Sequence, residues 1–473
     1  MPTETPAQKL VRPALIAMAV ALTSLMIIQS VMRRLNFDEW LILRAGWLIT
    51  SQEPSNLHFL MPWTWLAGHM DQLLPSAPIL VTVVRLMTAA TILTTLAWAL
   101  KAHHRSWHDA LHAYLLTLSC GAFIAHGIEF RYDAVVLCAW MAAWGALAHP
   151  TPGRLRIVGA LIVVLALHQT KGLLYAAALT LITWAINNRQ EPKSWRQVLI
   201  GALMAAVPWF SLLLAQGLLD EQVAVYAQFA RLRTELGAPA WTELLAQLRN
   251  DTYWWALAAT ATAMAIRRQI LGSALHITSI MAIPPIAFIL VHPHPWPYML
   301  VPCIPLLSSL CITALATRPK TFTMFAACLT LAVFAMPHHI HALQADGRDD
   351  LQLLAQLRAV QTSDDRVLDP SGAAYFIKPA TPYWYLDGLF RHRLAQGTWH
   401  PAPENPESLP QFVLRSYRLD WMDSFSPDLL GQHYENACHW LWIKKGDPRA
   451  KTLRKQCPST GDDSLLNYWQ IQP

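Results

Sequence analysis

The chain has 473 residues, of which 54% are hydrophobic and only 14% are charged, whereas soluble domains carry about 25% charged residues. This composition excludes an ordinary soluble protein and predicts a membrane protein. The net charge of +6 is not gathered into a basic run, so nothing in the sequence indicates nucleic-acid binding. Many of the 21 tryptophans lie near the ends of apolar runs, as in the aromatic belts of membrane proteins.

Apolar segments recur from residue 13 to residue 336 at lengths close to those of transmembrane helices. Such a helix needs about 20 mostly apolar residues, and we predict a polytopic α-helical membrane protein with about eleven spans. The predicted spans are 13–32, 77–100, 109–127, 133–149, 155–169, 172–188, 195–217, 252–266, 270–291, 298–317 and 320–336. The first is longer than the apolar core of a signal peptide, so we interpret it as a retained anchor. The spans 155–169 and 172–188 share a polar hinge, and a broken pair is the alternative to two full helices.

The distribution of Lys and Arg predicts the orientation of the spans. If the N-terminus is cytoplasmic, most basic residues of the short loops lie inside and most acidic residues lie outside, as the positive-inside rule requires. An odd number of spans then places the C-terminal segment outside. We therefore expect a multi-pass protein of the cytoplasmic (inner) membrane with a periplasmic or extracellular C-terminal domain.

Two domains are predicted. Residues 1–336 form a transmembrane domain whose outer loop, 33–76, carries an acidic motif, and residues 337–473 form a small extracytoplasmic α/β domain. The second domain is predicted to contain an amphipathic helix at 350–360, a strand entering a turn at 366–372, and strands at 411–414 and 440–443. Its Cys438 and Cys457 could form a disulfide in an oxidising compartment, but the sequence does not establish whether their geometry allows one.

The first outer loop places acidic residues directly after the first span. Residues 38–51 have helical spacing and 57–66 form a second apolar segment, both too short to span and suited to interfacial helices. Asp38 and Glu39 open the first of these segments. The structural alternative is that Asp38 caps the helix with its carboxylate and that Glu39 is only a first-turn acid.

Further ionisable residues lie beside apolar segments, where they tend to mark functional sites. The second outer loop holds Glu129, Arg131 and Asp133, and Arg131 can bind a phosphate as a planar fork. A local ion pair between Arg131 and Asp133, with Asp133 as a helix cap, is the alternative. Lys171 in the polar hinge favours an anionic partner such as a lipid phosphate, or it snorkels to the interface.

Arg85 lies about 12 Å into the second span, where it can pair with a phosphate or carboxylate or form a structural salt bridge. His294 and Tyr298 follow alternating prolines that force an extended turn before a late span. They can hold a metal or a phosphate, and packing or surface positions are the alternative.

Four motifs in this order resemble the GT-C superfamily of membrane glycosyltransferases, in particular the bacterial branch of protein O-mannosyltransferases and lipid A aminoarabinose transferases. They are Phe37-Asp38-Glu39, Glu129-Phe130-Arg131-Tyr132-Asp133, Thr170-Lys171-Gly172 and Tyr298-Met299-Leu300-Val301-Pro302, within residues 36–310. The chain departs from the family in the first loop, which often carries Lys-Pro-Pro or His-His-Pro-Pro. Here Leu57-His58-Phe59-Leu60-Met61-Pro62 leaves His58 as the substitute.

The resemblance implies an inverting glycosyltransferase that moves a sugar from a polyprenyl-phosphate donor to an acceptor hydroxyl at the outer membrane surface. The acceptor could be a lipid, a glycan or a protein. Asp38 is the expected general base or acceptor-orienting group, with Asp133 as the second catalytic carboxylate. The expected donor-phosphate ligands are Arg131, Lys171, His294, Tyr298 and Arg85, and the supporting residues are Glu39, Glu129 and His58.

A divalent metal on Asp38, Glu53 and His58 is a further option, and no other cofactor is expected. A transporter or flippase for a lipid-linked glycan is the main alternative function, since it would also need intramembrane charges and broken helices. A noncatalytic assembly scaffold is a third.

Overall fold

The computed structural model describes most of the chain, and the described part forms two compact units. The described residues are 6–51, 62–74, 76–168, 170–187, 193–217, 219–220, 223, 241–267, 273–292, 295–315, 321–380, 409–416, 418–419 and 427–457. The first unit consists of Met1–Ser30, Arg85–Gly217 and Gly237–Ala342. The second consists of Val31–Val84, Leu218–Leu236 and Leu343–Pro473.

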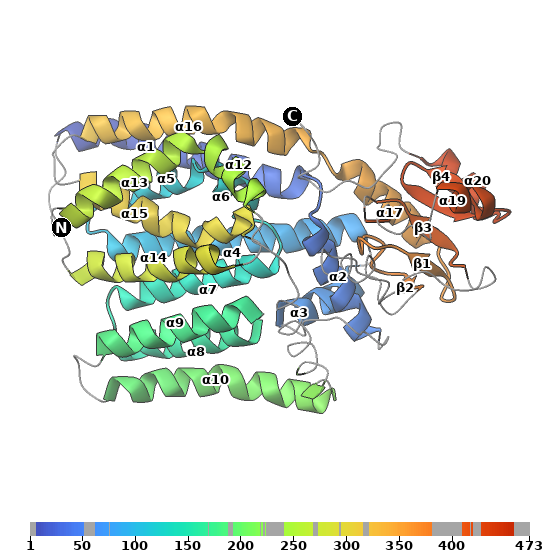
Figure 1. Ribbon diagram of the computed structural model, residues 1–473, viewed down its shortest axis with the longest axis horizontal. Coiled ribbons are helices and arrows are strands. Elements are labelled where there is room, and N and C mark those ends of the chain that lie inside the picture. Colours follow the sequence, from blue (N-terminus) through green and yellow to red (C-terminus); the bar gives the residue numbers. More distant parts are fainter. Residues whose placement is uncertain are drawn as a thin grey trace. The chain divides into compact units, whose positions relative to one another are not determined.

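Helices make up the first unit, and Figure 1 shows its long helices lying side by side. They are α1 (Pro6–Met32), α4 (Ala77–His103), α5 (Trp107–Leu118), α6 (Gly121–His126), α7 (Tyr132–Leu147), α8 (Pro152–His168), α9 (Thr170–Asn187), α10 (Lys193–Ala215), α12 (Thr242–Asn250), α13 (Thr252–Arg267), α14 (Ser273–Val291), the 3-10 helix η1 (Pro297–Cys303), α15 (Ile304–Leu315) and α16 (Thr321–Gln344). Small parts of α1, α4 and α16 belong to the second unit.

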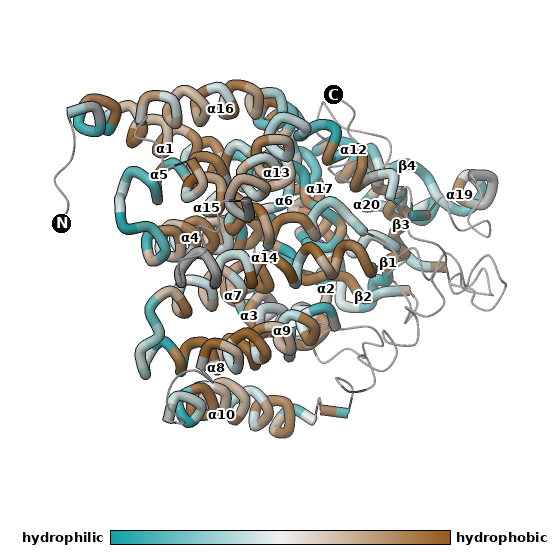
Figure 2. The backbone as a smooth tube through the Cα atoms, turned by 60° about the vertical axis from the view of Figure 1, so that its left-hand side comes forward, coloured by the Kyte–Doolittle hydropathy of each residue, from teal (hydrophilic) through white to brown (hydrophobic). Residues whose placement is uncertain are grey.

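The helices of the first unit have the length and surface of membrane spans. Among the described residues, five stretches are long and apolar enough to cross a bilayer: Gln8–Met32, Ala77–His103, Ser194–Ala215, Pro297–Leu315 and Phe322–Gln344. Shorter apolar helices cover Tyr132–Leu147, Lys171–Ile186 and Ile277–Val291. In Figure 2 helix α10 lies at one edge of the first unit and carries many brown, hydrophobic residues, and it exposes Leu203, Met204 and Val207. An apolar face of this kind fits lipid rather than water.

Each predicted span contains a helix, so the polytopic helical fold is confirmed, while the number of about eleven membrane crossings stays a prediction. The segment 109–127 is not one continuous helix as predicted: α5 ends at Leu118 and α6 begins at Gly121. The segments around the polar hinge form two separate helices, α8 and α9, which pack together as a hairpin. Lys171 therefore lies in the first turn of α9, at the tip of this hairpin.

The second unit combines the first outer loop with the C-terminal residues. Its helices are α2 (Phe37–Thr50), α3 (Pro62–Leu73), α17 (Arg348–Val360), α19 (Pro427–His433) and α20 (Arg449–Lys455). The loop predicted to belong to the transmembrane domain thus lies in one compact unit with the predicted α/β domain, and α16 continues through the predicted boundary at Pro337. Helices α2 and α3 cross closely, because a Cβ on Gly46 would lie 2.6 Å from the backbone nitrogen of Gly68.

A five-stranded mixed sheet forms the centre of the C-terminal part. Its strands are β1 (Arg366–Leu368), β2 (Lys378–Pro379), β3 (Phe412–Leu414), β4 (Tyr434–Cys438) and β5 (Leu441–Lys444), in the order β2-β1-β3-β5-β4. Strand β1 pairs in parallel with β2 and β3, while β5 is antiparallel to β3 and β4. The predicted helix at 350–360 and the strands within 366–372, 411–414 and 440–443 are present, whereas β2 and β4 were not anticipated.

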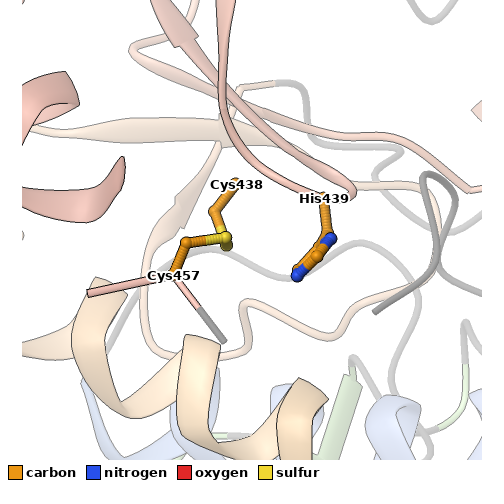
Figure 3. Close-up of side chains that lie close together, drawn as sticks. All are labelled: Cys438, His439 and Cys457. Atoms are coloured by element: carbon orange, nitrogen blue, oxygen red, sulfur yellow. A yellow bond between two sulfur atoms is a disulfide. The ribbon is translucent and has the colours of Figure 1, made fainter. Parts of the chain in front are cut away.

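The two cysteines of this part form the Cys438–Cys457 disulfide, with Cα atoms 5.5 Å apart. The bond joins Cys438, at the end of β4, to Cys457, which follows α20, and Figure 3 shows His439 beside it. A cross-link that closes a loop of this size stabilises a fold by about 3 kcal/mol in the chain-entropy treatment.

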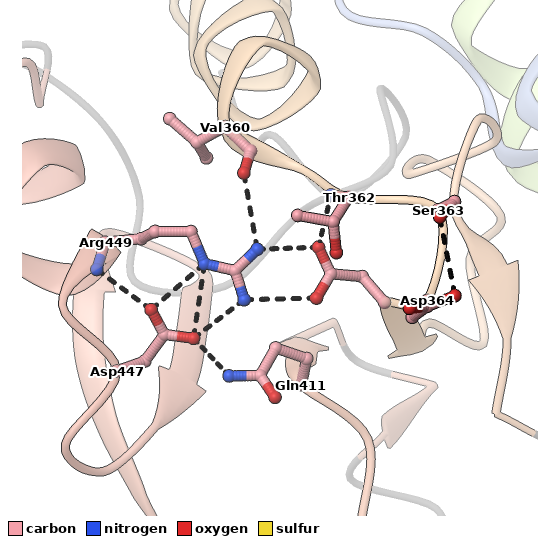
Figure 4. A network of polar contacts seen from close by, with 8 residues as sticks. Val360, Thr362, Ser363, Asp364, Gln411, Asp447 and Arg449 are labelled. Carbon is pink, nitrogen blue, oxygen red and sulfur yellow. Dashed lines mark hydrogen bonds and ion pairs between the residues drawn. The ribbon is translucent and has the colours of Figure 1, made fainter.

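Arg449 joins three segments of the C-terminal part through its guanidinium group (Figure 4). It forms a double hydrogen bond with Asp365, at 2.6 and 3.0 Å, and also bonds Asp447 at 2.7 Å. Its Nη1 donates to the carbonyl of Val360 at the end of α17. Hydrogen bonds from Arg449 lower the pKa of Asp447, and they also lower that of Asp365 although its burial alone would raise it.

We predict that Arg449→Met destabilises the sheet by about 2 kcal/mol, because two carboxylates lose their shared cation. Hydrogen exchange of the β1 and β5 amides in the full-length protein measures the loss. Because both pKa values are lower in the folded chain, the difference from wild type should persist above about pH 4 and shrink as the pH falls below it. Arg454→Met in the same helix is the control. The side chains of Arg454 and its partner Glu435 are 49% and 30% exposed, so this ion pair should contribute less than about 0.5 kcal/mol. Equal exchange in the two variants would contradict this prediction.

Candidate functional site

A buried group of charged residues lies in the first unit, where α6, α7, α9 and η1 approach one another. We call it the cation cluster, and it consists of His126, Glu129, Arg131, Asp133, Lys171 and Tyr298. Asp133 contacts both cations: its Oδ1 pairs with Lys171 Nζ, and its Oδ2 lies 3.7 Å from Arg131 Nη2. Glu129 Oε2 lies 3.2 Å from Arg131 Nη1 and 3.2 Å from His126 Nδ1.

Tyr298 provides an aromatic surface for both cations. The guanidinium carbon of Arg131 lies 4.0 Å from the centroid of the ring, and Lys171 Nζ lies 4.7 Å from it. Contacts of this kind contribute about 2 kcal/mol or more when they are desolvated. Tyr298 belongs to the first turn of η1, which starts with Pro297, so the predicted proline-rich turn delivers the ring to this place.

The cations are almost inaccessible to solvent, with exposed fractions of 4% for Arg131 and 7% for Lys171. Glu129 is buried as well, whereas the Asp133 side chain is 21% exposed. Buried charges are tolerated only when they are paired and hydrogen-bonded. With Glu129 and Asp133 ionised, the charges of the cluster balance, and Asp133 is the more exposed of its two carboxylates.

The local backbone explains why these residues meet. Arg131 is the N-cap residue of α7 in extended conformation, and Asp133 follows in the first turn, where the helix dipole favours a carboxylate. Lys171 also lies in a first helical turn, that of α9, where the dipole disfavours a cation. Its pairing with Asp133 offsets this penalty.

The structure therefore brings together five residues that were predicted for the site: Glu129, Arg131, Asp133, Lys171 and Tyr298. The alternative of a local Arg131–Asp133 pair is present only as part of this larger group. Arg85 is buried in α4, and its role as a phosphate ligand stays a prediction. Glu53, His58 and His294 lie outside the described residues.

Asp38 and Glu39 lie in the first turn of α2, in the second unit, and their side chains have different surroundings. The N-cap is Asn36 rather than Asp38: its side chain accepts a hydrogen bond from the Asp38 amide at 2.9 Å. Glu39 is fully buried and accepts from the Asn36 amide at 2.8 Å, which completes a capping box. Glu39 thus has a structural role as a first-turn acid, while Asp38 remains partly exposed.

Buried arginines fix α2 within the second unit. Arg44 Nη1 donates to the carbonyl of Ala374 at 2.5 Å, and burial lowers the Arg44 pKa to about 10 despite the nearby Asp369. Arg418 lies over the ring of Phe37, 4.9 Å from its centroid. The helix that carries Asp38 therefore rests on the turn after β1 and on residues after β3.

Glu53 and His58 of the predicted metal set lie outside the described residues, so a metal on Asp38, Glu53 and His58 stays a prediction. Within the described part of the chain, one group of three potential ligands lies close enough for a metal, namely Cys438, His439 and Cys457. Its two sulfurs are joined in the disulfide of Figure 3, so they offer no thiolate.

Sequence reasoning missed His126 and His168. His126 was hidden inside a predicted span, although its spacing of three residues from Glu129 could have indicated it. His168 ends α8, is 2% exposed, and its ring centroid lies 6.1 Å from that of Tyr132. His126 was obscured by the apolar residues before it, whereas His168 opens the polar hinge and was not considered as a site residue.

We predict that Asp133→Asn destabilises the protein by about 3 kcal/mol, because Arg131 and Lys171 lose the carboxylate they share. Thermal unfolding in detergent, followed with and without sulfate or inorganic phosphate, measures the effect. Added anion should stabilise the variant more than the wild type, since it can replace the missing charge. Asp346→Asn, which affects an ion pair at the surface, is the control and should show neither change. An unchanged melting temperature together with an unchanged anion response would refute the shared-carboxylate interpretation.

Comparison of the chain with protein-family models found no match, and comparison with curated proteins found none either. Solved structures do match. A crystal structure of ArnT from Cupriavidus metallidurans bound to undecaprenyl phosphate aligns with a TM-score of 0.61 and 15% identity, over 90% of this chain and 95% of that chain. The apo structure of the same protein aligns with a TM-score of 0.57 and 13% identity, over 89% of this chain and 94% of that chain. The chain therefore has the fold of ArnT, which confirms at the level of fold the resemblance to GT-C membrane glycosyltransferases.

Proposed function

We propose that this protein is a membrane glycosyltransferase that takes a sugar from a polyprenyl-phosphate donor and transfers it to an acceptor hydroxyl at the outer face of the cytoplasmic membrane. The observation that carries the proposal is the buried pair of Arg131 and Lys171 on the ring of Tyr298. Support also comes from the ArnT fold, since that protein has been crystallised with undecaprenyl phosphate.

Arg131 and Lys171 are suited to a phosphate that becomes a leaving group. A guanidinium and an ammonium make charge-assisted hydrogen bonds to phosphate oxygens, about twice as strong as neutral ones. In a buried setting their electrostatic effect on developing negative charge is larger than in water. Both cations are fixed against one aromatic ring, so they require little reorganisation when the donor binds.

Asp133 would hold the two cations in place before the donor arrives. In the structure it pairs with Lys171 and lies 3.7 Å from Arg131. A donor phosphate that binds the same cations would compete with this carboxylate, whose side chain is 21% exposed. Glu129, which is buried against Arg131 and His126, would keep the guanidinium oriented throughout.

Asp38 is the proposed base in this reaction. It would accept the proton of the acceptor hydroxyl as that oxygen bonds to the anomeric carbon, and the bond from that carbon to the phosphate oxygen would break with its electron pair leaving on the phosphate. A single displacement of this kind inverts the anomeric centre. Asp38 is preferred over Glu39 because Glu39 is buried in the capping box.

We predict that Arg131→Met and Lys171→Met each weaken binding of polyprenyl phosphate and reduce sugar transfer on the order of 10²-fold, the size seen when one stabilising donor is removed. Binding of the lipid to purified protein and transfer from a polyprenyl-phosphate sugar are the two measurements. Lys101→Met is a matched control, because Lys101 also lies over an aromatic ring, that of Trp107, in another part of the first unit. Sugar transfer at the wild-type rate by folded Arg131→Met and Lys171→Met proteins would contradict the proposal. Loss of lipid translocation with sugar transfer retained would also contradict it and would favour the transporter.

The two acids of α2 should respond differently to substitution. Asp38→Asn should leave lipid binding unchanged but lower transfer by on the order of 10²-fold or more, since the amide has nearly the same shape but cannot accept the proton. Glu39→Gln should instead lower stability by about 1 kcal/mol through a weaker capping box, with a smaller effect on transfer. Full transfer activity in a folded Asp38→Asn protein would eliminate Asp38 as the base.

A further inference from the structure

A second buried carboxylate lies in the first unit, outside the cation cluster. Asp251 follows the last residue of α12 and is 6% exposed. Its Oδ1 accepts a hydrogen bond from the Gly121 amide at 2.9 Å, and its Oδ2 accepts one from the Ala122 amide at 2.8 Å. Gln247 donates to Oδ2 at 2.8 Å, and His338 Nε2 lies 3.3 Å from Oδ1.

These two amides are the first of helix α6, so Asp251 caps that helix from 130 positions away in the sequence. The local N-cap residue, Cys120, makes no capping hydrogen bond with its side chain. With six residues, α6 is far shorter than the lengths of about 12–15 residues at which isolated helices become even marginally stable. Its start must therefore be fixed by tertiary contacts.

Gly121 allows the carboxylate to approach this closely. A Cβ at Gly121 would overlap Asp251 Oδ1 and would lie 2.6 Å from His338 Nε2. The carboxylate of Asp251 and the ring of His338 thus fill the space that a side chain at position 121 would occupy. Residues of α6, of the α12–α13 junction and of α16 meet at this one carboxylate.

Helix α6 leads directly to the donor-binding residues. It ends at His126, which contacts Glu129, and Glu129 in turn contacts Arg131. The ring of His126 also lies 6.0 Å from that of Tyr298, edge to face. A displacement of α6 would consequently move the residues that orient Arg131.

We propose that Asp251 is a positioning residue of the donor site, which acts through α6 on the chain of contacts from His126 through Glu129 to Arg131. This inference rests on the proposed function, because it assumes that Arg131 binds the donor phosphate. Asp251 itself touches no reacting group. Its effect is to keep a very short helix in the place that gives Arg131 its orientation.

The test is a double-mutant cycle between Asp251→Asn and Arg131→Met in the full-length protein, with binding of polyprenyl phosphate as the readout. Asparagine at position 251 keeps one acceptor oxygen, but its NH₂ group replaces the other oxygen and cannot accept a hydrogen bond from the N–H donors there. Asp251→Asn alone should weaken binding about tenfold, a modest fraction of the effect that a 1 Å displacement can have. In the Arg131→Met background it should have less than about a twofold further effect, because the two substitutions act on one interaction.

Gly121→Ala perturbs the same contact from the other side and should reproduce the loss of binding, which keeps the test valid if one variant fails to fold. Asp109→Asn, in the first turn of α5, is the matched control and should bind like wild type. Wild-type affinity in folded Asp251→Asn protein would overturn this inference and leave the proposed function standing. Equal losses from Asp251→Asn in the wild-type and Arg131→Met backgrounds would do the same. Absence of lipid binding by the wild-type protein would overturn the proposed function and the inference with it.

Discussion

Burial of two cations among apolar helices is the constraint on which the first unit depends. Arg131 and Lys171 are both more than nine-tenths buried, and unpaired charges in such surroundings would cost several kcal/mol each. Asp133, Glu129 and the ring of Tyr298 offset this cost within a few ångströms. Under the proposed function, a donor phosphate would compete with Asp133 for these two cations. The side chains that stabilise the empty protein would then also determine its affinity for the donor.

This requirement explains the irregular helices around the cluster. A continuous span through 109–127 would carry His126 along one regular helix, whereas the break before Gly121 allows α6 to start at Asp251. The turn between α8 and α9 similarly places Lys171 at a helix start, and the prolines before η1 do so for Tyr298. Each departure from a regular membrane helix delivers one member of the cluster. The backbone groups released by these breaks are satisfied by side chains such as Asp251, as they must be away from water.

The sequence predicted those site residues whose evidence lies in their immediate neighbours, and it did not predict contacts between distant positions. Glu129, Arg131, Asp133 and Lys171 were recognisable because charges are rare beside apolar segments. The capping box of Asn36 and Glu39 is equally local: the sequence indicated Glu39 as a possible first-turn acid, but it offered Asp38 rather than Asn36 as the cap. Asp251 could not have been connected with Gly121, because their contact spans 130 positions and leaves no periodic trace in the sequence. The packing of the first outer loop with the C-terminal residues was missed for the same reason.

In the second unit, the buried Arg34 and Arg44 and the half-buried Arg358 also join separate segments. Arg34 pairs with Asp350 at 2.8 Å, and Arg358 binds Asp71 of α3 through two hydrogen bonds, while Arg44 reaches the turn after β1. Arg34 and Arg358 thus join the residues before α2 and the helix α3 to α17, and Arg44 joins α2 to the turn after β1. The first turn of α2, which carries Asp38, is consequently anchored to C-terminal residues, although it belongs to a loop between two apolar helices.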